Sequence, residues 1–599
     1  MENFSTRPEL KGTFGMTTST HWLASSVGMS ILERGGNSFD AAVAMGFMLQ
    51  VVEPHLNGPG GEVPILFQSS NESRPKMLCG QGISPARANI EHFHDLGLDL
   101  IPGTGHLAAV VPGAFSAWMT LLRDYGTMTL KDVLSPAIFY AKSGYPLLKS
   151  VQEAISSVSE TFEKQWPSSA EIYLRGGTIP RAGRLFTNPN IARTWEKILT
   201  TIDTARDREK QIKLAEELFY RGFIAEEIIK FFKKPIMDSS GFKNLGIMEL
   251  DDMANWSASY EDPISYTWKD YEIFKGGPWS QGPVLLQQLA LLKYFDLESM
   301  DPNGTDFIHT IVEVSKLAFA DREAFYGDPN FVDTPVNTLL SEDYNKKRFE
   351  LVSESASKEL IPGDIAGYNN RIFDSSSLSF SSREGLIGGI GEPTMADLRQ
   401  NSKTLVEGDT CHINVIDKWG NMVAATPSGG WFQSSPVIPN LGFSITTRAQ
   451  MFWLNAGLPG SLQPKKRPRT TLSPCLAYKN NTPYLVWGTP GGDAQDQWNL
   501  IQFIRHTEHG LNLQETCDAP MFHSAHFPSS FYPRQALPAR VLIENRFRPS
   551  VSKALKRRGH DIREDGAWAI GRNSAISREE NILSAGASPR RMQGYAVGR

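Results

Sequence analysis

The chain has 599 residues, of which 40% are apolar and 21% are charged, the composition of an ordinary globular protein. Its formal net charge of −5 gives no support for nucleic-acid binding, and no nucleic-acid-binding motif occurs in it. The four Cys residues are widely spaced without a CxxC or Cys/His pattern, and no haem, flavin or nucleotide signature is present, so we expect neither a metal site nor a cofactor.

The N-terminal residues lack the apolar segment of a signal peptide. The most apolar early run, residues 41–52, is too short to cross a bilayer. We therefore expect a cytoplasmic protein that has no membrane partner and keeps its thiols reduced.

In the first hundred residues, strand and helix patterns alternate. Apolar residues at four-residue steps predict one helix, and a stretch that is small or apolar on every face predicts a second, buried helix with Ser38 and Asp40 as candidate caps. The predicted elements are a strand and turn over residues 15–21, helices over residues 23–34 and 41–53, and strands over residues 65–67 and 76–79.

Residues 111–234 are mostly helical by the same criterion, and a β-hairpin and two further helices follow. In the last of these helices the charged residues Lys316, Asp321, Arg322 and Glu323 are assigned to a solvated face. The predicted helices span residues 114–125, 130–143, 150–164, 191–202, 212–221, 224–232, 284–295 and 309–326, and the hairpin strands span residues 264–268 and 271–274.

A polar, Ser-rich segment, residues 363–409, predicts a mobile linker. Directly after it, alternating β-branched residues predict a half-buried strand that begins at Thr410. Residues 417–421 predict a hairpin turn and residues 422–426 the return strand.

A Thr at the first position of a strand, just after a tight turn, is either structural or a nucleophile. Cleavage of the Asp409–Thr410 bond would free an α-amine beside the Thr410 hydroxyl. Such an amine has a pKa of about 7.7–8.0, so it can serve as the base that activates the hydroxyl. The same hydroxyl could make the cut by attacking the Asp409 carbonyl and forming an ester that water opens.

The remaining segment alternates strands and helices again. Strands are predicted over residues 443–447, 475–478, 484–487 and 540–544, and helices over residues 494–509 and 551–558. Strands with helices before and after them are compatible with a four-layer αββα sandwich, but this pattern does not select it over other α/β layouts.

Several long stretches, in the same order, resemble the γ-glutamyltransferase family of N-terminal-nucleophile hydrolases over nearly the whole chain. The stretch Asp409-Thr-Cys-His412 is one of them, and Gly491-Gly492 before a helix is another. The other matching stretches are residues 33–44, 51–55, 58–61, 111–113, 316–322, 327–329, 417, 420–421, 467–468 and 473–474.

The resemblance implies an α/β fold, the four-layer αββα sandwich, with additional helices from a large subunit. It implies a precursor that cleaves itself between Asp409 and Thr410 into a large subunit, residues 1–409, and a small subunit, residues 410–599, which stay together as one intertwined globular domain. Its substrate would be a small amide or peptide.

Four residues match the catalytic positions of that family. Thr410 matches the nucleophile, and Ser428 matches a second hydroxyl, a Thr in the family, that hydrogen-bonds the nucleophile's amine. Gly491 and Gly492 match the pair whose N–H groups receive the oxyanion, where each donor stabilises the transition state by about 3 kcal/mol. Without the resemblance, the two glycines would equally fit a plain strand-to-helix turn.

The substrate-binding positions depart from the family. Gln81 stands where an Arg binds the α-carboxylate, and Arg448 and Met451 stand where acidic or amide residues hold the α-amino group. Gly430 replaces an Asn, and Thr470-Thr471 replaces a Ser pair. Exchanging these charges should cost several kcal/mol for an L-glutamyl group.

Three hypotheses follow: a hydrolase or acylase for a non-glutamyl amide, a true γ-glutamyl hydrolase or transpeptidase with a rearranged pocket, or a relative that has lost turnover. Arg448 either pairs with a substrate carboxylate or is structural. Trp431, Phe432 and Trp453 either line an apolar acyl pocket or belong to the core. His412 either lines the pocket or supports the strand.

Overall fold

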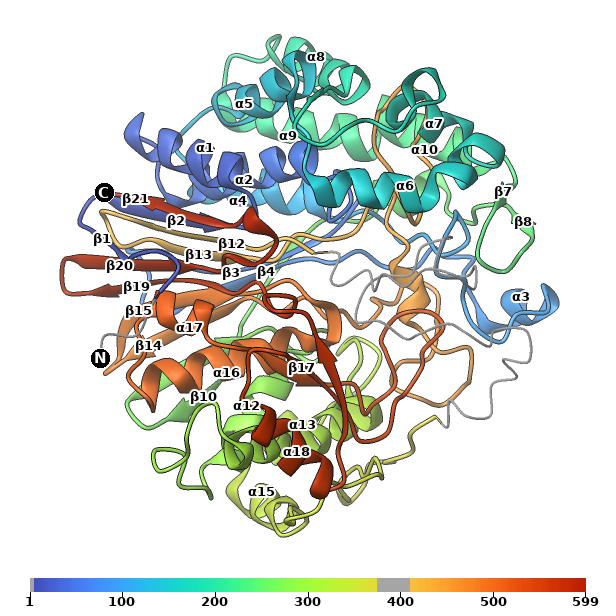
Figure 1. Ribbon diagram of the computed structural model, residues 1–599. Coiled ribbons are helices and arrows are strands. Elements are labelled where there is room, and N and C mark those ends of the chain that lie inside the picture. The colour runs from blue at the N-terminus through green and yellow to red at the C-terminus, as the bar shows by residue number, and fades with distance from the viewer. Residues whose placement is uncertain (1–4, 374–409) are drawn as a thin grey trace.

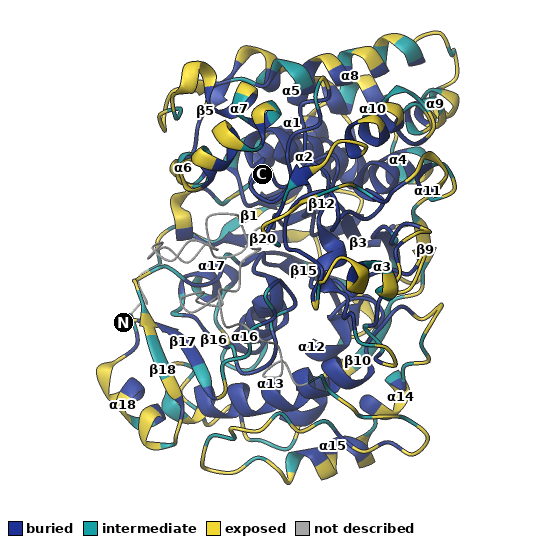
Figure 2. Ribbon diagram, turned by 90° about the vertical axis from the view of Figure 1, so that its right-hand side faces the viewer, coloured by how far each residue is buried: buried dark blue, intermediate teal, exposed yellow. Residues whose placement is uncertain are grey.

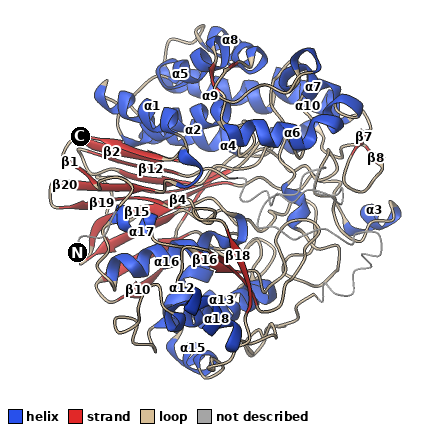
Figure 3. Cartoon of the chain, in the orientation of Figure 1, coloured by secondary structure: helices blue, strands red, loops and turns tan. Residues whose placement is uncertain are grey.

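The computed structural model describes residues 5–373 and 410–599 of the chain. Two seven-stranded sheets lie face to face between two layers of helices (Figure 1). Coloured by secondary structure, the strands occupy the middle of the molecule and helices cover both outer faces (Figure 3). The four-layer αββα sandwich expected from the resemblance is therefore confirmed.

The first sheet is antiparallel throughout and combines strands from before residue 373 and after residue 410. The hairpin β12–β13 lies in its middle, between β2 and β3, so the two segments are intertwined. The strand order is β21 (Tyr595–Gly598), β2 (Gly15–Ser19), β12 (Ile413–Asp417), β13 (Met422–Ala425), β3 (Val63–Gln68), β4 (Lys76–Gly80) and β9 (Ser259–Glu261).

The second sheet is also antiparallel and mixes the two segments in the same way. Its order is β1 (Leu10–Gly12), β20 (Ile582–Ala587), β19 (Ser574–Glu579), β15 (Thr482–Gly488), β14 (Cys475–Lys479), β11 (Tyr271–Lys275) and β10 (Ile264–Trp268). A small separate sheet contains β16 (Phe522–Ser524), β17 (Arg540–Glu544) and β18 (Asp561–Asp565).

The helices form an inner row against each sheet and an outer row toward solvent. Figure 2 shows the inner helices as mostly buried, with exposed residues gathered on the outer ones. The first sheet is covered by α1 (Trp22–Glu33), α2 (Ser38–Val52), α4 (Ala114–Tyr125), α5 (Leu130–Ser143), α6 (Lys149–Lys164), α7 (Pro167–Tyr173), α8 (Pro189–Ile202), α9 (Arg208–Tyr220) and α10 (Phe223–Phe232). The second is covered by α12 (Gly282–Leu292), α13 (Thr305–Phe325), α15 (Glu342–Phe349), α16 (Gln495–Thr507), α17 (Leu513–Asp518) and α18 (Pro549–Arg557).

Helix α2 illustrates why the inner row is buried. Its residues are small or apolar on every face, and all of them are buried, as its sequence predicts. Asn37 rather than Ser38 caps its N-terminus, and Asp40 completes the capping box by accepting from the Asn37 N–H. Gly46 in this helix allows Trp118 of α4 to approach, since a Cβ there would lie 2.5 Å from the indole ring.

Three sequence predictions need correction. Lys316, Asp321, Arg322 and Glu323 on α13 are all buried, because each has an ion-pair partner. Residues 443–447 are not a strand: only isolated bridges form at Ser444 and Ile445.

The strand predicted from Thr410 begins at Ile413 and is buried on both faces rather than half-buried. The reason is its central place in a sheet that has helices on one side and the second sheet on the other.

Of the predicted linker, residues 363–373 form a loop, and residues 374–409 lie outside the described residues. In the described part of the chain, no helix is both long and apolar enough to cross a membrane.

Candidate active site

Thr410 and Ser428 face each other at the open end of the β12–β13 hairpin. They form an isolated antiparallel bridge, and Thr410 Oγ1 lies 3.1 Å from Ser428 Oγ. Cys411 N–H donates to the Pro427 carbonyl at 2.9 Å, which continues the pairing of the two chains. The register of the hairpin therefore brings together two hydroxyls that are 18 residues apart in sequence.

Arg448 completes this group on the Ser428 side. Its Nη2 donates to Ser428 Oγ at 3.1 Å, and its Nε donates to Glu62 Oε1 at 2.6 Å. Arg448 and Glu62 are fully buried, so the two charges form a desolvated ion pair. Burial raises the pKa of the Glu62 carboxyl, an effect that the Arg448 guanidinium opposes.

The main chain of the nucleophile candidate is held from its other side. Arg572 Nη2 donates to the Thr410 carbonyl at 3.3 Å. The Cys411 thiol points to the opposite face and donates to Glu53 Oε2 at 3.2 Å. Thr20 also donates to that oxygen, at 2.5 Å. Burial raises the pKa of Glu53 and of the Cys411 thiol, an effect that the charge of Arg572 opposes at both groups.

His412 supports the strand. Its Nδ1 lies 3.0 Å from Thr426 Oγ1 and its Nε2 lies 2.9 Å from Asn414 Oδ1, so both ring nitrogens have partners. Burial lowers the pKa of His412 to about 3, and the imidazole is neutral at physiological pH. Of the two roles considered for His412, these contacts favour support.

Gly491 and Gly492 form the turn between β15 and α16. Both have positive φ, +131° and +52°. A Cβ on Gly491 would lie 2.1 Å from the Trp498 ring, so this position requires glycine for conformation and for space. Gln281 Nε2 donates to the Gly492 carbonyl at 3.3 Å and helps to fix the turn.

Among the predicted substrate-binding residues, Gln81 and Thr471 carry unpaired polar atoms. Within the described residues, neither amide atom of the buried Gln81 has a hydrogen-bond partner, and nor does Thr471 Oγ1. Buried polar atoms are rarely left unpaired, so these groups are candidates for contact with a ligand or water. Gln81 directly follows β4, at the end of the first sheet.

Met451, Gly430 and Thr470 complete the predicted set. Met451 Sδ lies 3.8 Å from Arg448 Nη1, and Gly430 adopts a φ of +71°. Thr470 bridges to Ser280. Its Oγ1 accepts from the Leu472 N–H at 3.3 Å. The contacts thus bring Thr410, Ser428, Arg448 and Met451 into one group and leave Gln81 without a hydrogen bond to them.

The aromatic residues divide between the two roles considered. The Arg448 guanidinium lies 5.0 Å from the Trp431 ring centre, so Trp431 belongs to the site's surroundings. Phe432 packs on Tyr173 with ring centres 4.4 Å apart and is part of the main core. Trp453 packs under Arg534, at 3.8 Å.

Sequence reasoning missed Glu62, Glu53 and Arg572. Glu62 directly follows Gly58-Pro-Gly-Gly61, a stretch that matches the family. Its place next to that stretch is the sequence signal that could have identified it as a site residue. Its partner Arg448 is 386 residues away, so pairing between them could not be deduced from spacing.

One group among the described residues has the spacing of a metal site: His309, Glu313 and His560. The two imidazoles are hydrogen-bonded to each other at 2.8 Å, and the Lys316 ammonium lies 2.6 Å from Glu313 Oε1. A cation already occupies the carboxylate, so these residues fit a polar cluster better than a metal ion.

The chain matches a known family model and is similar to a known protein over nearly its whole length. The family model described as Gamma-glutamyltranspeptidase matches residues 24–598. The glutathione hydrolase-like YwrD proenzyme of Bacillus subtilis is 28% identical, over 98% of this chain and 99% of the relative.

Two solved structures resemble the whole chain. A structure named LmbA2991HD has a TM-score of 0.92 and 50% identity, with 100% of both chains covered. The cephalosporin acylase from Bacillus halodurans has a TM-score of 0.81 and 26% identity, with 100% of this chain and 98% of that chain covered.

Proposed function

The chain belongs to the γ-glutamyltranspeptidase family and is an enzyme of the N-terminal-nucleophile hydrolase type, and we propose that it acts through Thr410 on an amide whose acyl group is not L-γ-glutamyl. The observation that carries this proposal is the chain of contacts Thr410–Ser428–Arg448, closed by Glu62. It combines the two hydroxyls proposed for the chemistry with a cation at the position that the resemblance matches to the site of a glutamyl donor's ammonium.

The proposed maturation step is cleavage of the Asp409–Thr410 bond, of which Asp409 lies outside the described residues. Thr410 Oγ attacks the Asp409 carbonyl carbon, the C–N bond breaks, and an ester joins the two segments. Water then opens the ester, which leaves a carboxylate on Asp409 and a free amine on Thr410. The products are residues 1–409 and residues 410–599.

In turnover the new α-amine accepts the Thr410 hydroxyl proton while Oγ attacks the substrate carbonyl. Ser428 hydrogen-bonds that amine, and the Gly491 and Gly492 N–H groups receive the oxyanion. Collapse of the intermediate expels the amine product with the transferred proton and leaves an acyl ester on Thr410. Water, or a second amine, then releases the acyl group.

The charges around Arg448 support the non-glutamyl donor. An L-γ-glutamyl group carries one ammonium and one carboxylate. The neutral Gln81 offers no charge to that carboxylate, and the position that the resemblance matches to the ammonium carries the Arg448 guanidinium instead of an acidic or amide group. Because Glu62 neutralises Arg448, the group beside Ser428 has no net charge and suits a neutral acyl chain.

A second candidate is a true γ-glutamyl hydrolase or transpeptidase acting on glutathione or its conjugates. The specific feature that favours it is the Glu62 carboxylate, an anion close to the position where the family holds the α-ammonium. An enzymatically inactive relative is a third reading, which the paired hydroxyls of Thr410 and Ser428 disfavour.

Two measurements on purified protein test the proposal. Mass spectrometry should find two chains that divide between Asp409 and Thr410, and Thr410→Ala should remain one inactive chain. A panel of p-nitroanilides should then include a short or aromatic acyl group that is hydrolysed at least tenfold faster than the γ-glutamyl compound. Faster turnover of γ-glutamyl p-nitroanilide would favour the second candidate, and an uncleaved wild-type chain without activity would favour the third.

A further inference from the structure

We propose that Arg322 on α13 is a positioning residue for catalysis, which holds the Gly491–Gly492 turn in place through Asp493 and Gln281. This inference rests on the proposed function, because it takes the turn to be the oxyanion site. The sequence pattern assigns Arg322 to a solvated helix face, whereas the structure buries it.

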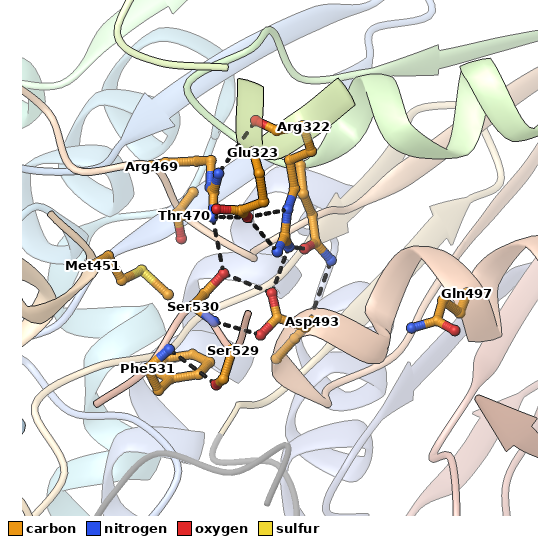
Figure 4. A network of polar contacts seen from close by, with 12 residues as sticks. Arg322, Glu323, Met451, Arg469, Thr470, Asp493, Gln497, Ser529, Ser530 and Phe531 are labelled. Atoms are coloured by element: carbon orange, nitrogen blue, oxygen red, sulfur yellow. Dashed lines mark hydrogen bonds and ion pairs between the residues drawn. The ribbon is translucent and has the colours of Figure 1, made fainter. Parts of the chain in front are cut away.

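Arg322 reaches the turn by two routes, and Figure 4 shows the one through Asp493. Its Nη1 donates to Asp493 Oδ1 at 2.5 Å, and Asp493 directly follows Gly492. The same nitrogen donates to Gln281 Oε1 at 3.0 Å, and Gln281 Nε2 donates to the Gly492 carbonyl at 3.3 Å. One guanidinium is thus connected to the carbonyl inside the turn and to the side chain that follows it.

The guanidinium itself is fixed. Arg322 is fully buried, and Glu323 Oε1 accepts from its Nε at 3.1 Å and from its Nη2 at 2.8 Å. Its Cζ lies 4.5 Å from the Phe319 ring centre, and Phe319 stacks on Phe527 at 3.8 Å. Water cannot replace these partners inside the core. The fixed position of the Arg322 guanidinium therefore also fixes the position of the turn to which it is hydrogen-bonded.

Glu323 is held in turn by a second cation. Arg469 Nη2 donates to Glu323 Oε1 at 2.7 Å, and Arg469 Nη1 donates to the Arg322 carbonyl at 3.3 Å. Burial alone would raise the pKa of Glu323, but Arg469 and Arg322 lower it to about 2. The Glu323 carboxylate therefore stays ionised over the physiological pH range.

Asp493 also connects the turn to residues 530–534, a segment that lies beside Arg448 and Met451. Its Oδ2 accepts from the Ser530 N–H at 2.8 Å and its Oδ1 from Ser530 Oγ at 2.6 Å. The next residue, Phe531, lies 5.7 Å from the Arg448 guanidinium. Arg534 Nη1 links the Ser530 and Met451 carbonyls, at 2.6 and 3.2 Å. The Asp493 carboxylate thus fixes the position of the turn relative to the segment beside Arg448 and Met451.

This arrangement is better explained by positioning than by stability. A buried ion pair often contributes little net stability compared with apolar residues of similar size. Oxyanion donors, in contrast, must lie within about 0.5 Å of their productive position, which requires rigid support from the residues behind them. The Arg322–Asp493 pair supplies such support to a turn whose glycines have no side chains of their own.

Three variants test the proposal: Asp493→Asn, which keeps the size and one acceptor but removes the charge; Arg322→Lys; and Gln281→Leu, which removes the link from Arg322 through Gln281 to the Gly492 carbonyl. The matched control is Arg590→Lys, because Arg590 is also buried and paired with a carboxylate, Glu544, at 2.8 Å. It makes no contact with the turn.

Two readouts are measured per molecule of cleaved enzyme: kcat and KM for the fastest p-nitroanilide of the panel, and the second-order rate of Thr410 modification by phenylmethanesulfonyl fluoride, followed by mass spectrometry. The second needs no knowledge of the donor. Melting temperatures report stability separately.

For Asp493→Asn and Arg322→Lys we expect kcat and the modification rate to fall about 10- to 100-fold, with KM changed less than threefold, because the oxyanion forms only in the transition state. For Gln281→Leu we expect a fall of about 3- to 10-fold. Arg590→Lys should lower the melting temperature by a similar amount and keep both rates within twofold of wild type.

The proposal is overturned if the three variants keep wild-type rates per cleaved molecule, or if Arg590→Lys loses as much as they do. If Arg322→Lys and Asp493→Asn do not fold, Gln281→Leu decides, since it leaves the ion pairs in place. Failure of the proposed function looks different: Thr410→Ala would then retain turnover, whatever the other variants do.

Discussion

The buried ion pair between Arg448 and Glu62 predicts how much stability the protein loses when Arg448 is replaced. In Arg448→Met the Glu62 carboxyl stays buried and loses its cation. Breaking a buried pair in this way costs about 3–5 kcal/mol when the remaining group is charged. Removing the second charge as well, in Arg448→Met/Glu62→Gln, should restore most of that loss, because no uncompensated charge remains.

The loss should also depend on pH. Burial already raises the pKa of Glu62 above its usual value with Arg448 present, and loss of the guanidinium raises it further. The folded variant then binds a proton more tightly than the unfolded chain, whose Glu pKa is about 4.3. The folded state is therefore most favoured below the unfolded pKa, and the free energy of unfolding falls as pH rises through the folded pKa, by at most about 1.4 kcal/mol per pH unit.

The assay is urea denaturation at pH 5 and pH 8. A Thr410→Ala background is used, so that under the proposed function the chain stays in one piece and unfolding does not depend on protein concentration. Relative to that background, Arg448→Met should lose about 3–5 kcal/mol at pH 8 and clearly less at pH 5. An equal loss at the two pH values, or a double variant as unstable as the single one, would refute the assignment of a buried, charged pair.

Ser428→Ala should lower kcat about 10- to 100-fold, measured with the best p-nitroanilide, while Ser428→Thr, the residue of the family, retains activity. Gly491→Ala should be destabilised and inactive, measured by melting temperature and turnover, because φ is +131° and the new Cβ meets Trp498 at 2.1 Å. The pH profile of kcat/KM should rise with an apparent pKa of about 7.7–8.0, that of the Thr410 amine, and should show no ionisation of His412, whose pKa burial lowers to about 3. The four Cys residues, all buried, should react with a thiol reagent such as Ellman's reagent only after unfolding; rapid reaction of the native protein would contradict their burial.

Much of the fold could be predicted from local pattern. Helices α4 and α5 begin and end as predicted, because each has a regular apolar stripe and clear end signals. In α5, Thr129 and Asp132 form a capping box, and Gly144, with a φ of +95°, ends the helix. The hairpin β12–β13 was predicted from its turn residues, but residues 410–412 form only an isolated bridge at Thr410 and one hydrogen bond from Cys411 to Pro427, so the strand starts later than its composition suggests.

The error on α13 has a different cause. Charged residues are usually solvated, and this general preference assigned Arg322 and Glu323 to the surface. Their partners Asp493 and Arg469 are more than 140 residues away, on segments whose approach depends on the completed sandwich. The same applies to Glu62 and Arg448. Local sequence specifies which residues carry charge, but only the tertiary fold decides which charges become paired and buried.

These long-range pairs share one property that bears on how a cleaved chain could remain active. Arg322–Asp493, Glu62–Arg448 and Lys275–Asp496 each join a residue before position 373 to one after position 410, and all are buried. Strands β12 and β13 lie between β2 and β3, so the backbone hydrogen bonds of the first sheet cross the same boundary. Separating the two segments would break the sheet and expose at least three buried ion pairs at once. The groups proposed for catalysis therefore depend on contacts that do not involve the peptide bond before Thr410, and cutting that bond can release the Thr410 amine without releasing the support around it.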